Sequence, residues 1–259
     1  MAVLFLRTFA AAMMFARRFR LLAFVPLLLA AACGTSYQVA QHSSVIYNVK
    51  DTSPDSSLYR LVQPYKEELD KKMSEVIGRA DTTLTKKQPE CTLGNFMADA
   101  QLAAARELYP DVTVSVSNYG GIRVSYLQEG PVMLRHMYEL MPFDNTLVIL
   151  ELPGTVLVEF CQHMASLKGW PVSGLSYTIK DKKAVNIKVN GQAVKEDALY
   201  KVATSDYVAN GGDNCHFLKA YKPVLTNIFV RDVLIAYVRN RTASGQALSA
   251  TLENRVTNE

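Results

Sequence analysis

Two glycine-bearing polar turns constrain the fold of this chain most, because each of them follows a strand pattern. Residues 112–117 alternate valine with threonine or serine, which predicts a strand, and they run into the turn 118–123 (Asn-Tyr-Gly-Gly-Ile-Arg). A second predicted strand, 200–204, leads into the turn 209–213 (Ala-Asn-Gly-Gly-Asp). Since loops at strand ends are where a rigid sheet presents ligand contacts, both turns are candidate parts of a binding site.

The rest of the chain mixes helix and strand patterns. Apolar residues at three- and four-residue spacing predict helices at 58–77, 93–108, 134–140, 155–167 and 228–238. Gly78 is expected to end the first of these helices and Thr92 to cap the second. Further strands are predicted at 146–152, 175–179 and 185–189, the last followed by the hairpin signal Asn190-Gly191. Because helices and strands do not alternate strictly, we expect an α+β fold, with one domain at 57–259 built from a mixed β-sheet and flanking helices.

The first 33 residues have the composition of a targeting segment. They contain arginine but no lysine and no acidic residue, and an apolar stretch, 21–32, ends in Ala-Ala-Ala before Cys33. This segment resembles a bacterial lipoprotein signal with Cys33 as the lipidated first residue of the mature chain. An ordinary signal peptide cut near Ala32 and a single N-terminal anchor are the alternatives. Residues 34–56 are polar and are interpreted as a tether, so the expected location is the bacterial cell envelope, on the periplasmic side of a lipid anchor.

The charge of the chain changes once this leader is set aside. The whole chain carries 28 basic and 24 acidic residues, and four of the basic residues lie in the leader, so the remainder is formally neutral. A neutral chain has no global field to attract nucleic acid. Three cysteines follow Cys33: Cys91, Cys161 and Cys215. Because their number is odd, they can form one disulfide at most. Cys161 lies on a predicted helix and is most simply a buried apolar residue.

Six segments together resemble a known domain. They are, in order, 92–100, 118–123, 141–147, 172–177, 200–204 and 206–213. In this order and at these separations they are similar to the C-terminal domain of the 5'-nucleotidase family of periplasmic and cell-surface nucleotide hydrolases. The resemblance extends over about residues 68–241 and implies an α+β domain that holds the nucleoside end of the substrate.

The resemblance also implies roles for particular residues. The base would lie between the rings of Phe143 and Tyr207, where family members usually have Phe at the second position. Asp213 would accept hydrogen bonds from the ribose hydroxyls, and Arg123 would bind the phosphate. The side-chain amides of Asn118 and Asn145 would contact the base or its neighbouring groups. Gly120 and Gly121 would let the backbone approach the ligand closely.

Two further positions depart from the family pattern. Lys87 stands at the best match to an arginine that commonly contacts the phosphates, and a lysine offers a point charge instead of a planar fork. Tyr119 replaces the first glycine of the usual triple, which is expected to narrow the pocket. Both departures suit an alternative in which the chain is a structural or interaction lipoprotein that kept the fold but lost ligand binding. The joint presence of the other expected binding side chains argues against that alternative.

The chain has no recognisable catalytic motif of its own. In the full-length family a separate N-terminal domain hydrolyses the substrate with two metal ions held by Asp, His and Asn. Here no Gly-x-Ser-x-Gly elbow or P-loop is present. The four histidines are scattered along the chain; they are His42, His136, His163 and His216. A metal site at 212–216 is a weak alternative, and a complete enzyme with an unrecognised active site is another. We therefore expect a chain with no catalytic residue and no cofactor, which binds a nucleoside or nucleotide and depends on a separate dimetal phosphoesterase chain for hydrolysis.

Overall fold

The computed structural model describes residues 44, 45, 47 and 56–259, and the chain divides into two units at Pro54 and Asp55. The predicted leader 1–33 with Cys33, and nearly all of the predicted tether, lie outside the described residues. Within the described part, no helix has both the length and the apolar character needed to cross a membrane. The fold below is that of the second unit.

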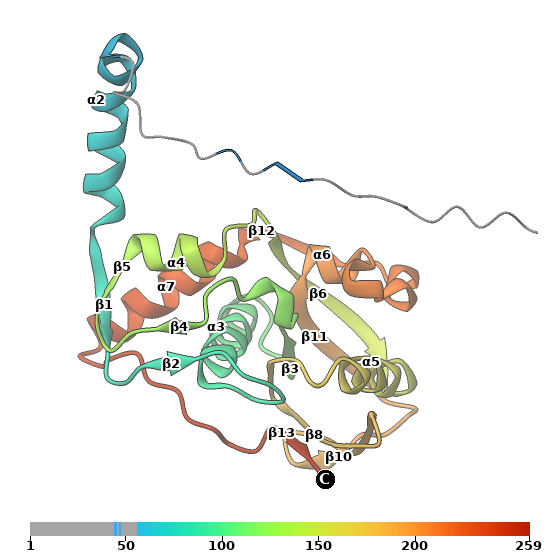
Figure 1. The fold of residues 1–259 in the computed structure, drawn as a ribbon. Coiled ribbons are helices and arrows are strands. Elements are labelled where there is room, and N and C mark those ends of the chain that lie inside the picture. The colour runs from blue at the N-terminus through green and yellow to red at the C-terminus, as the bar shows by residue number, and fades with distance from the viewer. Residues whose placement is uncertain (1–43, 46, 48–55) are drawn as a thin grey trace, which may run out of the picture. The chain divides into compact units, whose positions relative to one another are not determined.

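A five-stranded mixed sheet with the order β12-β6-β11-β3-β7 forms the centre of this unit (Figure 1). β6 (Thr146–Pro153) pairs antiparallel with both β11 (Leu199–Ser205) and β12 (Val224–Phe229). On its other side β11 pairs in parallel with β3 (Val114–Val116), which pairs antiparallel with β7 (Val172–Ser173). The combination of parallel and antiparallel neighbours confirms the predicted mixed sheet.

Residues 147–150 of strand β6 are apolar because both faces of the strand are buried there, whereas Glu151 is exposed. Leu147 and Ile149 belong to one hydrophobic core, whereas Val148, Leu150 and Leu152 belong to the other. Successive side chains of a strand point to opposite faces, so a strand covered on both sides needs apolar residues at every position. The two cores therefore meet at this sheet.

Helices cover one face of the sheet. The first core joins α3 (Thr92–Leu108), α4 (Leu134–Leu140) and α7 (Val230–Ala243) to this face, with Phe96 and Leu234 among its buried side chains. Two small antiparallel ladders border it: β1 (Val76–Ala80) with β5 (Gly130–Met133), and β2 (Leu84–Thr85) with β4 (Tyr126–Leu127).

The other face packs against α5 (Gly154–Ser166) and a second sheet. That sheet has the order β10-β9-β8-β13, and β13 joins it in parallel. Its strands are β8 (Leu175–Lys180), β9 (Lys183–Val189), β10 (Gln192–Ala193) and β13 (Val256–Asn258). Phe160 of α5 is fully buried in this core and meets Trp170 edge-on, with ring centroids 6.1 Å apart. The layers together give the predicted α+β architecture.

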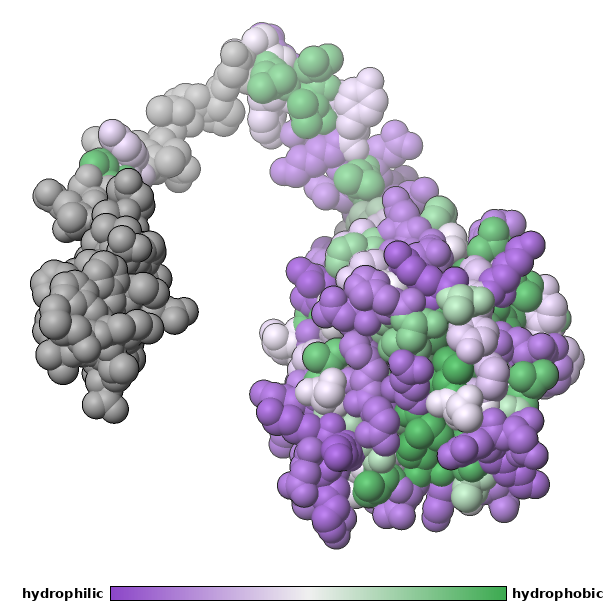
Figure 2. Space-filling model, turned by 90° about the vertical axis from the view of Figure 1, so that its right-hand side faces the viewer, coloured by the Kyte–Doolittle hydropathy of each residue, from purple (hydrophilic) through white to green (hydrophobic). Residues whose placement is uncertain are grey.

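The predicted helix 58–77 is wrong at its C-terminal end. Helix α2 (Ser56–Met73) stops short, and Val76 and Ile77 lie instead in β1, where Val76 pairs with Met133 of β5. Ile77 is buried in the first core, whereas α2 has no buried residue, and Figure 2 shows hydrophobic surface on this helix. Pairing with a strand more than 50 residues away thus outweighs the continuing helical spacing.

Two other predicted boundaries are corrected by the structure. The cap of α3 is Cys91 and not Thr92, because the Cys91 Sγ accepts a hydrogen bond from the Gly94 amide at 3.3 Å. The Thr92 hydroxyl instead accepts from the Thr85 amide. The last predicted helix starts at Val230 instead of residue 228, since 228 belongs to β12, whose register is broken next to Asn227 at a φ of 58°.

Four remaining elements are short and lie at the edge of the sheet that carries the predicted site residues. The turn 118–123 contains the 3-10 helix η1 (Tyr119–Gly121). After β11 come α6 (Asp206–Ala209) and the 3-10 turns η2 (Gly212–Asn214) and η3 (His216–Ala220). The turn 118–123 follows β3, and the turn 209–213 follows β11 and α6. Both glycine-bearing turns therefore lie beyond the ends of strands, as predicted.

Candidate functional site

The pairing of three strands brings the predicted site residues to one edge of the central sheet. Because β3 and β11 are parallel, their C-terminal ends lie together, and the turn 118–123 and helix α6 leave the sheet side by side. β6 runs antiparallel to β11, with Leu147 opposite Ser205, so its N-terminal end and the preceding Asn145 lie at the same edge. Three segments that are distant in sequence therefore meet there.

A pocket of about 240 Å³ opens at this edge. Its lining consists of eight of the nine residues that the sequence predicts as substrate-binding: Asn118, Gly120, Gly121, Arg123, Phe143, Asn145, Tyr207 and Asp213. The ninth, Lys87, is exposed and does not line the pocket. The structure thus brings the glycine turns and the aromatic loop together as one cavity wall.

The turn 118–123 packs its backbone closely around Asn118. A Cβ atom on Gly121 would lie 2.9 Å from the Asn118 Oδ1, so a larger residue here would have to displace the Asn118 side chain. The Gly121 amide donates to the Asn118 carbonyl at 3.0 Å, and the Asn118 side chain is largely buried. Arg123 turns back over the loop, with its guanidinium 5.5 Å from the centre of the Phe143 ring.

The loop that carries Phe143 and Asn145 is held by the start of helix α7. The buried Arg231 donates to the Phe143 carbonyl at 3.4 Å and forms an ion pair with Asp144 at 3.0 Å. The Val230 amide donates to the Asn145 carbonyl at 2.9 Å. With its backbone fixed in this way, Phe143 is 39% exposed and lines the pocket.

Asp213 links the two glycine turns. One carboxylate oxygen accepts a hydrogen bond from the Asn118 amide group at 2.7 Å, and the other accepts from the Tyr207 hydroxyl at 2.9 Å. This acceptance raises the pKa of Tyr207 above its ordinary value, because ionising the phenol would remove the bond. The acid is therefore oriented by neutral donors on both of its oxygens.

Lys86 contacts the turn that carries Arg123, although it does not itself line the pocket. The Lys86 ammonium donates to the Ile122 carbonyl at 2.6 Å and sits 4.3 Å from the centre of the Tyr119 ring. Partial burial, and then the charge of Arg123, lower the pKa of Lys86. Among the described residues, no carboxylate forms an ion pair with Lys86 or Arg123. Their joint positive charge is free to attract an anion.

Lys86 is the residue near this site that sequence reasoning missed. The resemblance pointed to Lys87, but the alternation from β2 onward places Leu84 inward, Thr85 outward, Lys86 half-buried and Lys87 outward. That period of two is a signal that could have separated the neighbouring lysines. The prediction of a phosphate contact from Lys87 stays untested.

The described residues hold no group of three or more His, Cys, Asp or Glu side chains that could bind a metal ion. In the turn 212–216, the weak metal alternative of the sequence, the Asp213 carboxylate is engaged by Asn118 and Tyr207. Cys215 is a buried free thiol, and burial raises its pKa to about 12, which disfavours the thiolate that a metal needs. These residues do not fit a metal centre.

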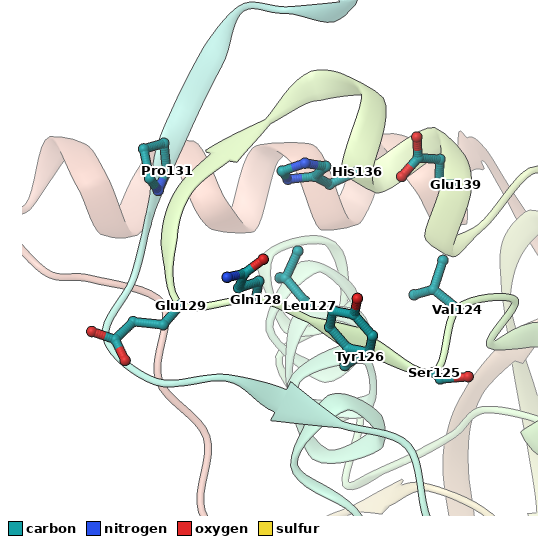
Figure 3. Close-up of a pocket in the computed structure, with 9 residues that line it drawn as sticks. All are labelled: Val124, Ser125, Tyr126, Leu127, Gln128, Glu129, Pro131, His136 and Glu139. Carbon is teal, nitrogen blue, oxygen red and sulfur yellow. The ribbon is translucent and has the colours of Figure 1, made fainter.

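A larger hollow of about 640 Å³ lies elsewhere, between β4, β5 and α4 (Figure 3). His136 and Glu139 border it from α4, and Gln128 and Tyr126 border it from the opposite side. Its lining has two acidic residues, Glu129 and Glu139, and no lysine or arginine. A hollow of this charge repels phosphate, so size alone does not identify the site.

Comparisons with known proteins show the family of this chain. The family model described as "5'-nucleotidase, C-terminal domain" matches residues 74–220, more than half of the chain. The cell wall protein Lmo0130 of Listeria monocytogenes is 25% identical over 82% of this chain and 30% of its own length. The trifunctional nucleotide phosphoesterase protein YfkN of Bacillus subtilis is 32% identical over 58% of this chain and 12% of its own.

Among solved structures, a 5'-nucleotidase precursor from Thermus thermophilus matches with a TM-score of 0.68 and 25% identity. The match covers 79% of this chain and 43% of that one. The present chain therefore spans less than half the length of each of these relatives. The family match, the fold and the arrangement of the site lead to one assignment: this chain belongs to the family of 5'-nucleotidase C-terminal domains.

Proposed function

We propose that this chain binds the nucleoside end of a nucleotide and is the specificity subunit of an exported 5'-nucleotidase in nucleotide catabolism. The observation that carries the proposal is the pocket at the sheet edge. It gathers two partly exposed aromatic rings, amide groups, an oriented carboxylate and an arginine, supplied by three separate segments. A fold kept only for structural reasons does not need all of these side chains together, which disfavours the structural lipoprotein alternative.

Each lining residue has a chemical part in this proposal. Phe143 and Tyr207 offer stacking faces to the base, because every base has a π-face that aromatic rings bind. Asn118 and Asn145 supply amide groups near the base, and Asp213 accepts hydrogen bonds from the ribose hydroxyls. The close backbone of Gly120 and Gly121 leaves room for the ligand.

The phosphate would lie toward the two cations. Arg123 provides a planar fork that matches phosphate oxygens, and Lys86 adds a second positive charge beside it. The formally neutral remainder of the chain means that this attraction is local. It suits one small nucleotide and not a nucleic acid.

Binding of this kind does not by itself cleave a phosphate ester. Stacking and ground-state contacts do not lower a hydrolytic barrier unless a nucleophile or metal acts in the transition state. We propose that a separate metallophosphoesterase subunit supplies two divalent metal ions, which would activate water and stabilise the leaving group. This chain would then position the nucleotide for that partner.

The proposal places the protein in the cell envelope, on a lipid anchor at Cys33. The composition of the leader supports export, and one relative is named a cell wall protein. Metabolic labelling with a radioactive or alkyne fatty acid, compared between the wild-type chain and Cys33→Ser, tests the anchor directly.

Calorimetry tests the ligand. The full chain, purified in mild detergent, should bind AMP and adenosine, and Phe143→Ala or Tyr207→Ala should each lose about 1–3 kcal/mol of binding free energy. Tyr126→Ala is the matched control, because Tyr126 is an exposed aromatic residue that lines the other hollow. Absence of heat and of thermal protection with every nucleoside and nucleotide would overturn the proposal.

The partner is tested separately. The chain is used as bait in an extract of its own envelope, and the eluate is assayed for AMP hydrolysis with and without a chelator. Chelator-sensitive hydrolysis in the eluate, absent from the purified chain, is the expected result. Phosphate release by the pure chain would instead support a complete enzyme.

A further inference from the structure

The backbone of Asp213 adopts an unusual conformation for a residue with a side chain. Its φ and ψ are 48° and 35°, in the left-handed region, and the neighbouring Asn214 also has a positive φ of 66°. Such conformations persist when the surrounding structure over-determines them, and they cluster at ligand-binding sites. The contacts that hold Asp213 in this conformation therefore indicate which function the left-handed backbone supports.

Four hydrogen bonds hold this residue, and two of them come from a single tyrosine hydroxyl. The Tyr207 oxygen donates to the Asp213 carboxylate at 2.9 Å and accepts from the Asp213 amide at 3.2 Å. Asn118 donates to the second carboxylate oxygen, and the His163 Nε2 lies 2.9 Å from the Asp213 carbonyl oxygen. The hydroxyl of Tyr207 thus fixes both the backbone and the side chain of Asp213.

The tyrosine ring is itself fixed, so the hydroxyl has a defined position. A Cβ on Gly212 would lie 2.5–2.6 Å from three carbon atoms of the Tyr207 ring, which shows that the ring packs directly on the glycine backbone. The Tyr207 amide donates to Asp206, whose same oxygen accepts from the Thr146 amide of β6. Ring and acid are therefore held in one rigid relation to the central sheet.

The remaining acceptor capacity of Asp213 suits two adjacent hydroxyl groups. A carboxylate has about four acceptor positions, and the bonds from Tyr207 and Asn118 occupy one on each oxygen. One position is left on each oxygen. Among the described residues, no cation forms an ion pair with Asp213. The two free acceptor positions of its carboxylate can therefore accept hydrogen bonds from neutral donors of a ligand. The vicinal 2'- and 3'-hydroxyls of a ribose match this arrangement.

We propose that the Tyr207 hydroxyl is a positioning group that orients Asp213 for both ribose hydroxyls and so gives the site its preference for ribonucleosides over 2'-deoxyribonucleosides. This inference rests on the proposed function, because it concerns the same pocket. The family resemblance implies a stacking role for the Tyr207 ring, and the hydroxyl adds a second role through Asp213. With Phe at this position the ring would remain, but one carboxylate oxygen would lose its donor and the acid would be free to rotate.

The test compares adenosine with 2'-deoxyadenosine on the full chain by calorimetry. The wild type should prefer adenosine by about tenfold or more, because a site built to bind a hydroxyl discriminates against the analogue that lacks it. Tyr207→Phe should weaken adenosine binding more than 2'-deoxyadenosine binding and reduce that ratio to about threefold or less. Tyr126→Phe, a tyrosine in the other hollow, should leave the ratio at its wild-type value.

A double-mutant cycle separates positioning from a merely structural role. Asp213→Asn should abolish most of the ribose preference, and adding Tyr207→Phe to that variant should change the ratio no further, since the two residues act as one unit. An unchanged ratio in Tyr207→Phe, or an equal loss for both ligands, would overturn the inference while leaving the proposed function in place. A rise in the ratio would show that the hydroxyl competes with the sugar and would overturn it as well. If the wild type binds no nucleoside, the proposed function fails and this inference fails with it.

Discussion

Lys86 lies over the face of Tyr119, with its ammonium nitrogen 4.3 Å from the ring centre, and it extends toward the turn that carries Arg123. Tyr119 is the residue that replaces a glycine of the family pattern. Its ring supports the aliphatic and charged parts of the lysine, as cation–π contacts do. This contact and the hydrogen bond to Ile122 hold the Lys86 ammonium beside the turn 118–123.

The contact of Lys86 with Tyr119 predicts which of the two neighbouring lysines contributes to the proposed phosphate binding. Lys86→Ala should weaken AMP binding about three- to tenfold and adenosine binding much less, because only AMP carries the charge that Lys86 attracts. Lys87→Ala is the matched variant, one residue along the same segment, and should weaken AMP binding less than Lys86→Ala does. Titration calorimetry of both ligands at two salt concentrations measures these differences. The reverse order of the two variants would restore Lys87 as the phosphate contact.

The loop with Phe143 should depend on an arginine that does not line the pocket. Arg231 holds the Phe143 carbonyl and Asp144 from α7, and its guanidinium stacks 4.3 Å from the centre of the Tyr138 ring. Arg231→Met keeps much of the packing volume but removes these bonds. We expect adenosine binding to weaken about five- to tenfold, since the loop must then be ordered by the ligand. Isothermal calorimetry measures the loss, and circular dichroism checks that the fold is retained.

His136 predicts a pH dependence of stability. Its Nδ1 accepts a hydrogen bond from the Met133 amide at 3.1 Å at the start of α4. Burial lowers its pKa below the ordinary 6.5, so the folded chain favours the neutral ring. The stability that comes from keeping His136 neutral is fully present above pH 6.5. It is lost as the pH falls through the lowered pKa of His136 in the folded state.

The variant His136→Asn tests this link, because its side-chain oxygen can still accept from the Met133 amide but does not titrate. The free energy of unfolding in urea, measured from about pH 7.5 down to about pH 5, should fall less steeply in this variant than in the wild type. Parallel pH profiles for the two proteins would contradict the assignment.

A bidentate ion pair should contribute most to holding the C-terminal strand. Arg255 binds both carboxylate oxygens of Asp99 on α3, at 2.7 and 2.9 Å, and also donates to the Val172 carbonyl. The Arg255 side chain is only 12% exposed, so removing Asp99 leaves a largely buried guanidinium whose remaining ion pair is with Glu253 at 3.0 Å. Asp99→Ala should therefore lower the free energy of unfolding by about 3 kcal/mol.

The matched control is Lys180→Ala. The ion pair of Lys180 with Glu259 joins β8 to the other end of the same C-terminal segment, but both side chains are more than half exposed. Its loss should cost about 0–1 kcal/mol. The fluorescence of Trp170, the single tryptophan and a buried one, reports both unfolding curves. Equal losses in the two variants would show that burial does not distinguish the pairs.

The three described cysteines should be unreactive in the folded state. Cys91, Cys161 and Cys215 are buried free thiols, and burial raises the pKa of Cys161 to about 12. Because the thiolate is the reactive form, a thiol reagent at about pH 8 should label native protein slowly. In the Cys33→Ser chain three thiols should titrate after denaturation. A count of one would reveal a disulfide between two of them.

Local patterns in the sequence predicted the elements whose apolar residues recur at regular spacing or form an unbroken run. The short helix at 134–140 matches α4, and the strand at 146–152 lies within β6, since their apolar periodicities are complete within a few residues. The two-residue strands β2, β4 and β7 have no periodicity to read. Val76 and Ile77 continue a helical spacing, and only their distant pairing with β5 reveals a strand.

The candidate site could be predicted because its motifs lie in order along the chain, not because local physics requires a pocket. No periodicity brings Asn118, Asn145 and Tyr207 together; the register of β3, β11 and β6 does. The choice between Lys86 and Lys87 depends on which one turns inward after β2. The hydrogen bonds between Tyr207 and Asp213 need a left-handed backbone that the sequence only hints at through its glycines.

The parallel pairing of β3 and β11 has a consequence for how the protein acquires its activity. The paired residues Val114 and Val202 are almost 90 positions apart, and such distant contacts form late because the intervening chain must first be closed into a loop. Helices α3 and α5 can form before this pairing, but the pocket cannot. Under the proposed function, ligand binding would therefore report that folding is complete, and a partly folded chain would not bind a nucleotide.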